Sequence, residues 1–187
     1  MLFVEIIFIF VDCFLPYPAE YFKEDGKEQL LNNVGKFNTD YTDPAMEEAQ
    51  NFIFGYCICN DISEREWQKN RGGQWVKGKS GDTFGPLGPY LVTKDEIKNP
   101  FDLNLSLDLN GNRRQTGNTS LMIFNFNFLI AHITQFITLM PGDIITTGTP
   151  AGVGMGMKPP EYLKDGDEMI LKVDNLGEQK LKVIKEK

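Results

Sequence analysis

The 187-residue sequence contains only one histidine and three cysteines, and this scarcity excludes several kinds of site. A structural zinc site needs four His or Cys ligands, which one histidine and scattered cysteines do not supply. His132 lies in an apolar stretch that predicts a helix, where a structural role is expected rather than catalysis. The sequence also has no P-loop and no GxGxxG pattern after a strand. The chemistry that remains uses carboxylates, a lysine, hydroxyls and amides.

Positive charge is also scarce, because the net charge is −7 at pH 7. A nucleic-acid partner held by a basic surface is therefore not expected. Cys57 and Cys59 are two positions apart, so they share one face of a strand and do not bridge easily. We interpret them as reduced, apolar core residues of a cytoplasmic protein.

The sequence lacks a long apolar run free of polar groups, so no membrane association is expected. The first fifteen residues, MLFVEIIFIFVDCFL, have no basic segment before the apolar run and carry Glu5 and Asp12. They are short for a membrane span, and a buried or interface strand is the favoured interpretation. A second apolar stretch, residues 121–139, contains Asn125 and His132 and predicts one long buried helix. Thr119 or Ser120 would cap this helix, and Pro141-Gly142 would end it.

The remaining sequence is rich in strand patterns. LNLSLDL alternates cleanly over residues 103–109, and Asn110-Gly111 after it is a strong hairpin signal. A second hairpin is expected where residues 175–177 join EMILKVD to KLKVI. Further strands are expected at 52–61 and 143–149, and a short helix at 44–50. These elements predict an α+β fold, mostly β, of roll-like or barrel-like form.

The stretch TTGTPAGVGMG, residues 146–156, is unusually rich in glycine for a simple turn. Such a loop brings backbone amides and hydroxyls close to a small anionic ligand, and Thr149 and Gly148 would lie in it. The alternative is a long Gly-rich loop without a ligand.

Two further segments concentrate polar groups. In NDISEREWQ, a helical turn would place Asp61, Arg65 and Gln68 on one face, where they could hold a hard cation and a carboxylate together. The alternative is a capped helix with a surface Arg–Asp pair. In GKSGDTF, Lys79 stands among Gly, Ser and Asp residues, and is either solvated or poised in a site.

Taken together, these segments resemble the fumarylacetoacetate hydrolase family from about Phe52 to the C-terminus. The resemblance is carried by GYCICNDISERE, GGQWVKGKSGDTFGPLGPYLVT, RQTGNTSLMIF, LMPGDIITTGTPAGVG and YLKDGDEM. It is strongest to the branch of acylpyruvate hydrolases, hydroxyheptadienedioate isomerases, ureidoglycolate lyases and diketo-deoxy-fuconate hydrolases. It divides the single-domain chain into an atypical segment, 1–44, and a catalytic domain, 45–187.

The resemblance implies a mixed β-roll, usually a homodimer, with one Mg²⁺ or Mn²⁺ per active site. The substrate would be a small 2-oxo acid of acylpyruvate type, whose C–C bond is cleaved through a metal-bound enolate. An isomerase or lyase step on the same enolate would be a related outcome. The metal would stabilise the developing enolate charge.

The resemblance also assigns roles to single residues. Asp61 matches the metal-binding aspartate, and Arg65 and Gln68 match substrate-binding positions. Lys79 matches the active-site lysine. Thr149, with Gly148 beside it, matches the threonine that binds the substrate carboxylate, and Thr83 has a supporting role.

The sequence departs from the family where a Glu-x-Glu metal-binding pair is expected. Family spacing places that pair at Lys27 and Gln29, with Glu28 between them as a possible single ligand. One aspartate alone binds Mg²⁺ poorly. Two hypotheses follow: an enzyme with an altered metal site, or a catalytically impaired or truncated family member that keeps the fold and the oxo-acid pocket.

Overall fold

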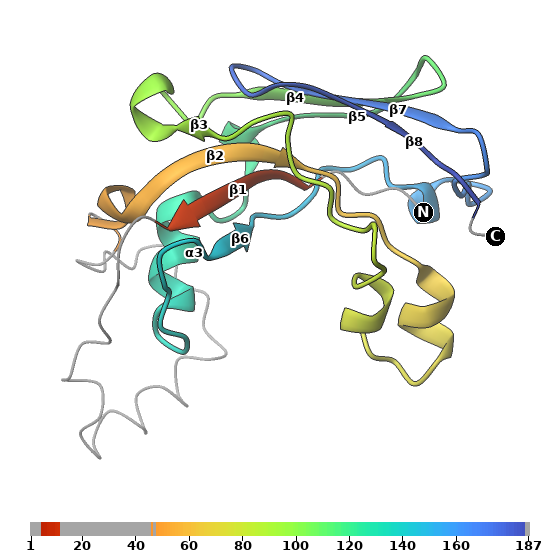
Figure 1. Cartoon of the computed structure of the whole chain (residues 1–187), viewed down its shortest axis with the longest axis horizontal. Helices are drawn as coiled ribbons and strands as arrows, with labels where there is room; N and C mark the ends of the chain where they lie inside the picture. Colours follow the sequence, from red (N-terminus) through yellow and green to blue (C-terminus); the bar gives the residue numbers. More distant parts are fainter. Residues whose placement is uncertain (1–4, 12–45, 47, 186–187) are drawn as a thin grey trace.

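Local hairpins build the second half of the chain into one antiparallel sheet. The computed structural model describes residues 5–11, 46 and 48–185. Four of its strands, in the order β5-β4-β7-β8, form what we call sheet B (Figure 1). These strands are β4 (Asn104–Leu109), β5 (Asn112–Asn118), β7 (Glu168–Val173) and β8 (Gly177–Lys182). Both predicted hairpins are confirmed.

The turn residues explain why these hairpins form. Asn110 and Gly111 both have positive φ, 50° and 77°, which suits the right-handed twist of the flanking strands. In the second turn Asn175 and Gly177 also have positive φ, 64° and 87°. Asparagine and glycine tolerate this conformation better than other residues, so the turn sequences fix both registers.

The other sheet, which we call sheet A, is assembled from segments far apart in sequence. Its strands are β1 (Glu5–Val11), β2 (Ile53–Cys59), β3 (Val92–Thr93) and β6 (Ile144–Thr146), in the order β3-β2-β1-β6. The strand predicted near the N-terminus is therefore present. It pairs with β2 on one edge and β6 on the other, so both of its edges are used within the chain.

One apolar core joins the two sheets and the helix. The predicted leucine face is confirmed, because Leu103, Leu105, Leu107 and Leu109 are all at most 7% exposed. The same core contains Tyr56 of β2, whose ring centroid lies 5.7 Å from that of Phe126 in the helix. Apolar burial on this scale is the main contribution to the stability of the fold.

The cysteines of β2 form a separate small cluster. Cys57 and Cys59 are buried and not bonded to each other, as predicted, while Cys13 lies outside the described residues. Burial raises the pKa of the Cys57 thiol to about 11. The thiol is therefore protonated and unreactive at neutral pH.

The helix within residues 121–139 is shorter than predicted. It is α3, Phe126–Ile133, and it has Asn125 as its N-cap, with the Asn125 side chain accepting a hydrogen bond from the Phe128 amide. Thr119 does not cap it, because the Thr119 hydroxyl accepts from the Leu103 amide and donates to the Pro100 carbonyl. Residues before and after α3 form turns instead of further helix.

Short helical turns complete the described structure. They span Ala49–Phe52, Glu66–Asn70, Val76–Gly78, Lys94–Glu96, Thr119–Leu121 and Gly154–Gly156. The helix predicted at 44–50 falls partly outside the described residues, although Met46 and Glu48 are helical. Within the part of the chain that the structure describes, none of the helices combines the length and apolar character needed to cross a bilayer.

Candidate active site

Strand direction brings the two polar segments to the same edge of sheet A. Both β2 and β6 run antiparallel to β1, so they run parallel to each other, and Phe8 of β1 pairs with Cys57 and with Thr146 (Figure 1). The segment that begins at Asp61 and the Gly-rich loop therefore leave the sheet at one edge. They are two strand spacings apart, about 10 Å.

Asp61 and Lys79 form an ion pair at this edge. The Lys79 ammonium contacts Asp61 Oδ2, and the two side chains are 27% and 16% exposed. Lys79 is thus paired and only partly exposed, while its role in a site remains a prediction. The segment that carries Lys79 is held close to the segment that follows Asp61 by the hydrogen bond from the Glu64 amide to the Gly78 carbonyl, 2.8 Å.

Glycine at position 78 is needed for this close approach. A Cβ atom there would lie 2.6 Å from both the Glu64 carbonyl oxygen and Gln68 Cβ. Such distances are not tolerated, so a larger residue would push the Lys79 segment away from Asp61.

Arg65 and Gln68 form a buried polar pair beside Asp61. Gln68 is fully buried and Arg65 is 8% exposed, and Arg65 Nη1 donates to Gln68 Oε1. Arg65 is therefore a buried residue and not a surface one, and the helical turn that follows it begins with the Glu64 carboxylate accepting from the Glu66 amide, 2.9 Å. Burial lowers the pKa of Arg65, while the charge of Asp61 and the nearby Tyr162 hydroxyl raise it.

The amide nitrogen of Gln68 has no hydrogen-bond partner in the described structure. A buried donor without an acceptor is costly, by about 1–3 kcal/mol. A carboxylate or oxo oxygen of a ligand beside Arg65 would satisfy it.

Two aromatic residues that the sequence did not single out surround Arg65. The guanidinium carbon lies 5.9 Å from the Trp75 ring centroid, within the range of a cation–π contact. Tyr162 lies close enough to Arg65 to affect its pKa. Trp75 and Tyr162 are 62% and 49% exposed, so both are accessible at the surface around a buried polar interior.

The Gly-rich loop contains glycines in a backbone conformation that other residues rarely adopt. Gly148 and Gly152 have positive φ, 101° and 109°. Thr149 is exposed, and its hydroxyl accepts from the Gln115 amide at 3.3 Å. Gly148 and Thr83 are also exposed. Strand register places the loop at the same edge as Asp61.

The donors at this edge fit a divalent ion only in part. Among the side chains that the structure describes, no group of three His, Cys, Asp or Glu residues could hold a metal. Asp61 supplies one carboxylate, which holds Mg²⁺ only when ligand oxygens and waters complete the shell. Lys27, Glu28 and Gln29 lie outside the described residues. The backbone of Glu5 pairs with that of Cys59, two positions before Asp61.

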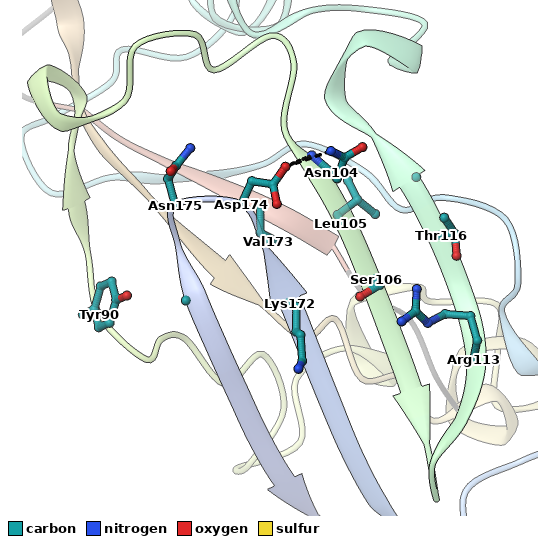
Figure 2. Close-up of a pocket in the computed structure, with 12 residues that line it drawn as sticks. Tyr90, Asn104, Leu105, Ser106, Arg113, Thr116, Lys172, Val173, Asp174 and Asn175 are labelled. Atoms are coloured by element: carbon teal, nitrogen blue, oxygen red, sulfur yellow. Dashed lines mark hydrogen bonds between the residues drawn. The ribbon is translucent and has the colours of Figure 1, made fainter.

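A pocket on sheet B is an alternative candidate for the site. It has a volume of about 590 Å³ and lies over β4, β5 and β7 of sheet B (Figure 2). Its charged groups have partners, since Arg113 pairs with Asp108, Lys172 with Glu178, and Asp174 accepts from Asn104. No residue that the sequence singled out as a candidate lines it. We therefore place the candidate site at the edge of sheet A.

His132 lies on α3, where its ring stacks on Phe128 and meets Phe136 edge-on. Its ring centroid is 6.0 Å from that of Phe128 and 5.3 Å from that of Phe136. This arrangement agrees with the structural role expected from the sequence.

Comparison with known proteins identifies the same fold and sequence family. Residues 34–184 match the family described as fumarylacetoacetate (FAA) hydrolase C-terminal. A relative from Burkholderia multivorans, provisionally named a hydrolase, is 57% identical over 132 residues, 70% of this chain and 47% of its own length. A Burkholderia ambifaria relative is 56% identical over 158 residues, 84% of this chain and 55% of its own. The chain spans about half the length of the curated relatives it matches.

Solved structures of similar fold belong to the same family. Fumarylacetoacetate hydrolase from Exiguobacterium antarcticum has a TM-score of 0.77 and 34% identity, covering 99% of this chain and 56% of that one. Maleylpyruvate hydrolase from Sphingobium, solved in complex with manganese(II) and pyruvate, has a TM-score of 0.74 and 26% identity. That match covers 100% of this chain and 55% of the other.

Proposed function

Because the chain belongs to the fumarylacetoacetate hydrolase family, we propose that it is a divalent-metal-dependent enzyme acting on a small 2-oxo acid of acylpyruvate type. The reaction we propose is hydrolysis of the C–C bond between the acyl carbon and the methylene carbon. Water adds to the acyl side, which leaves as a carboxylic acid, and the other product is pyruvate. An isomerase or lyase acting on the same type of enolate is the related alternative.

The observation that carries the proposal is the group of polar side chains at one edge of sheet A. Arg65 and Gln68 are buried, and the Gln68 amide has no partner within the described structure. A substrate with adjacent oxo and carboxylate oxygens supplies an acceptor for the Gln68 amide and negative charge beside the Arg65 guanidinium. Lys79 adds a positive charge to the same edge.

Each residue then has a distinct task. Arg65 and Gln68 bind and orient the oxo-acid oxygens, and the Thr149 hydroxyl and the Gly148 amide bind the carboxylate end. Lys79 neutralises negative charge that develops on the enolate oxygen. Asp61 would hold a Mg²⁺ or Mn²⁺ ion, whose chemistry when bound is Lewis-acid stabilisation of the enolate.

A second candidate function is binding of the oxo acid without turnover. It is favoured by the donor set, because the described side chains contain no group of three His, Cys, Asp or Glu residues that could hold a metal, and Asp61 is paired with Lys79. The homodimer implied by the sequence resemblance also remains a proposal, which light scattering in solution would measure.

A turnover assay separates the two functions. Metal-stripped protein is mixed with acetylpyruvate, with and without Mn²⁺, and loss of the diketo-acid absorbance is followed together with pyruvate release. We expect turnover that depends on Mn²⁺ and yields one pyruvate per acetylpyruvate consumed. Binding of acetylpyruvate without pyruvate release would favour the second function.

A further inference from the structure

Gln115 is a buried polar residue that contacts the Gly-rich loop. It lies in β5 of sheet B and is 1% exposed. Its amide nitrogen donates to the Pro150 carbonyl at 2.9 Å and to the Thr149 hydroxyl oxygen at 3.3 Å. An amide nitrogen carries two hydrogens, so these two bonds use both. The contact joins sheet B to a loop that leaves sheet A.

The shape of the loop depends on the same strand. A Cβ atom on Gly152 would lie 2.0 Å from the Arg114 carbonyl oxygen and 3.0 Å from Gln115 Cγ. A Cβ atom on Gly117 would lie 3.1 Å from Pro150 Cβ. The loop is therefore fitted directly against β5, and Gln115 supplies the hydrogen bonds that fix its position there.

The direction of the Gln115–Thr149 bond determines what the hydroxyl offers. A threonine hydroxyl has one hydrogen and two lone pairs. Since Thr149 Oγ1 accepts from Gln115, the hydroxyl hydrogen is directed away from the Gln115 amide. A donor at this position suits the carboxylate of an anionic ligand.

We infer that Gln115 is a positioning residue for carboxylate binding: its two hydrogen bonds fix the Gly-rich loop on β5 and orient the Thr149 hydroxyl. The inference rests on the proposed function, because Gln115 acts through Thr149 and not on the substrate itself. Through Gln115, sheet B contributes a residue that supports the site at the edge of sheet A. The pocket over the surface of sheet B is not involved.

A double-mutant cycle on ligand affinity tests this. The dissociation constant of oxalate is measured by titration calorimetry in the presence of Mn²⁺ for the full chain and for Gln115→Met, Thr149→Val and the double variant. Methionine keeps the length and volume of glutamine but removes both donors. We expect each single variant to bind oxalate about tenfold more weakly, the effect of one lost hydrogen bond. The double variant should be no weaker than Thr149→Val, because the two residues act as one unit.

Gln115→Glu provides the second variant. It keeps the shape but replaces the donors with a negatively charged acceptor, so the Thr149 hydroxyl would turn toward it. We expect oxalate to bind more weakly than to Gln115→Met, whereas a purely structural role predicts similar losses for both. In an active preparation, Gln115→Met should raise KM while kcat stays within about twofold.

Gln179→Met is the matched control. Gln179 is also a buried glutamine of sheet B, and its amide donates to the Pro86 carbonyl at 3.0 Å. Gln179→Met should lower the melting temperature about as much as Gln115→Met does. It should leave oxalate affinity within about twofold of the unmutated chain, because Gln179 does not contact Thr149.

The outcomes are distinguishable. Unchanged oxalate affinity in Gln115→Met and Gln115→Glu, or additive losses in the double variant, would overturn the role of Gln115 and leave the proposed function intact. Failure of the unmutated chain to bind oxalate with Mn²⁺ would contradict the proposed function and the inference with it.

Discussion

The two sheets differ in how their strands are brought together. In sheet B, β4 pairs with β5 and β7 with β8 through tight turns, so hairpins between neighbours along the chain supply two of its three pairings. In sheet A, β1 pairs with β6, although the strands are separated by most of the chain. The candidate site is at the edge of sheet A, where Asp61, Arg65 and Lys79 gather. The candidate site therefore lies where strands distant in sequence meet, and not on the sheet built from local hairpins.

The largest expected effect comes from comparing one ion pair in each sheet. Asp61→Asn removes the site carboxylate, and we expect turnover to fall by at least about 100-fold, since metal and charge stabilisation contribute several kcal/mol. Asp108→Asn breaks the Arg113–Asp108 pair on sheet B and should leave turnover within about twofold, because exposed pairs contribute little. Steady-state kinetics with acetylpyruvate and Mn²⁺ measures both. Equal losses would contradict the placement of the candidate site at the edge of sheet A.

A substitution in the apolar core should reduce stability without changing ligand affinity. Leu107 in β4 is fully buried, and Leu107→Ala should lower the free energy of unfolding by about 2–5 kcal/mol. Oxalate affinity of the protein that remains folded should not change. Urea denaturation followed by circular dichroism, with calorimetry below the transition, tests both statements. A large affinity loss with little destabilisation would refute the assignment of Leu107 to the scaffold.

The smallest expected effect concerns the aromatic residues around Arg65. Trp75→Ala removes the cation–π contact, and we expect oxalate to bind about fivefold more weakly, with little change in stability. Trp67, 39% exposed in the neighbouring turn, provides the control variant Trp67→Ala, which should retain full affinity. Equal effects of the two substitutions on the dissociation constant would show that Trp75 has no specific role.

Sheet B was predictable from sequence because its signals are local. The alternation of leucines and the Asn-Gly turn determine the β4–β5 hairpin without reference to the rest of the chain. The resemblance also singled out Asp61 and Lys79, which the structure places in contact. The roles given to these residues remain predictions.

Long-range contacts were the part that sequence reasoning missed. Nothing in the motif RQTGNT reveals that the Gln115 amide bonds to Thr149, 34 positions away. The helix was predicted too long at both ends: the Thr119 hydroxyl is bonded to residues 103 and 100, so Asn125 is the N-cap, and the helix ends at Ile133, well before Pro141. The position of β1 between β2 and β6 likewise depends on pairing across the whole chain.

The most direct test of the account is a titration of Mn²⁺ into metal-stripped protein, with and without oxalate as an enolate mimic. The account predicts weak Mn²⁺ binding alone, strong binding when oxalate is present, and loss of both in Asp61→Asn, because ligand oxygens must complete the metal shell. Absence of binding with oxalate present, or binding that Asp61→Asn leaves unchanged, would contradict the claim that this edge of sheet A is a metal-dependent oxo-acid site.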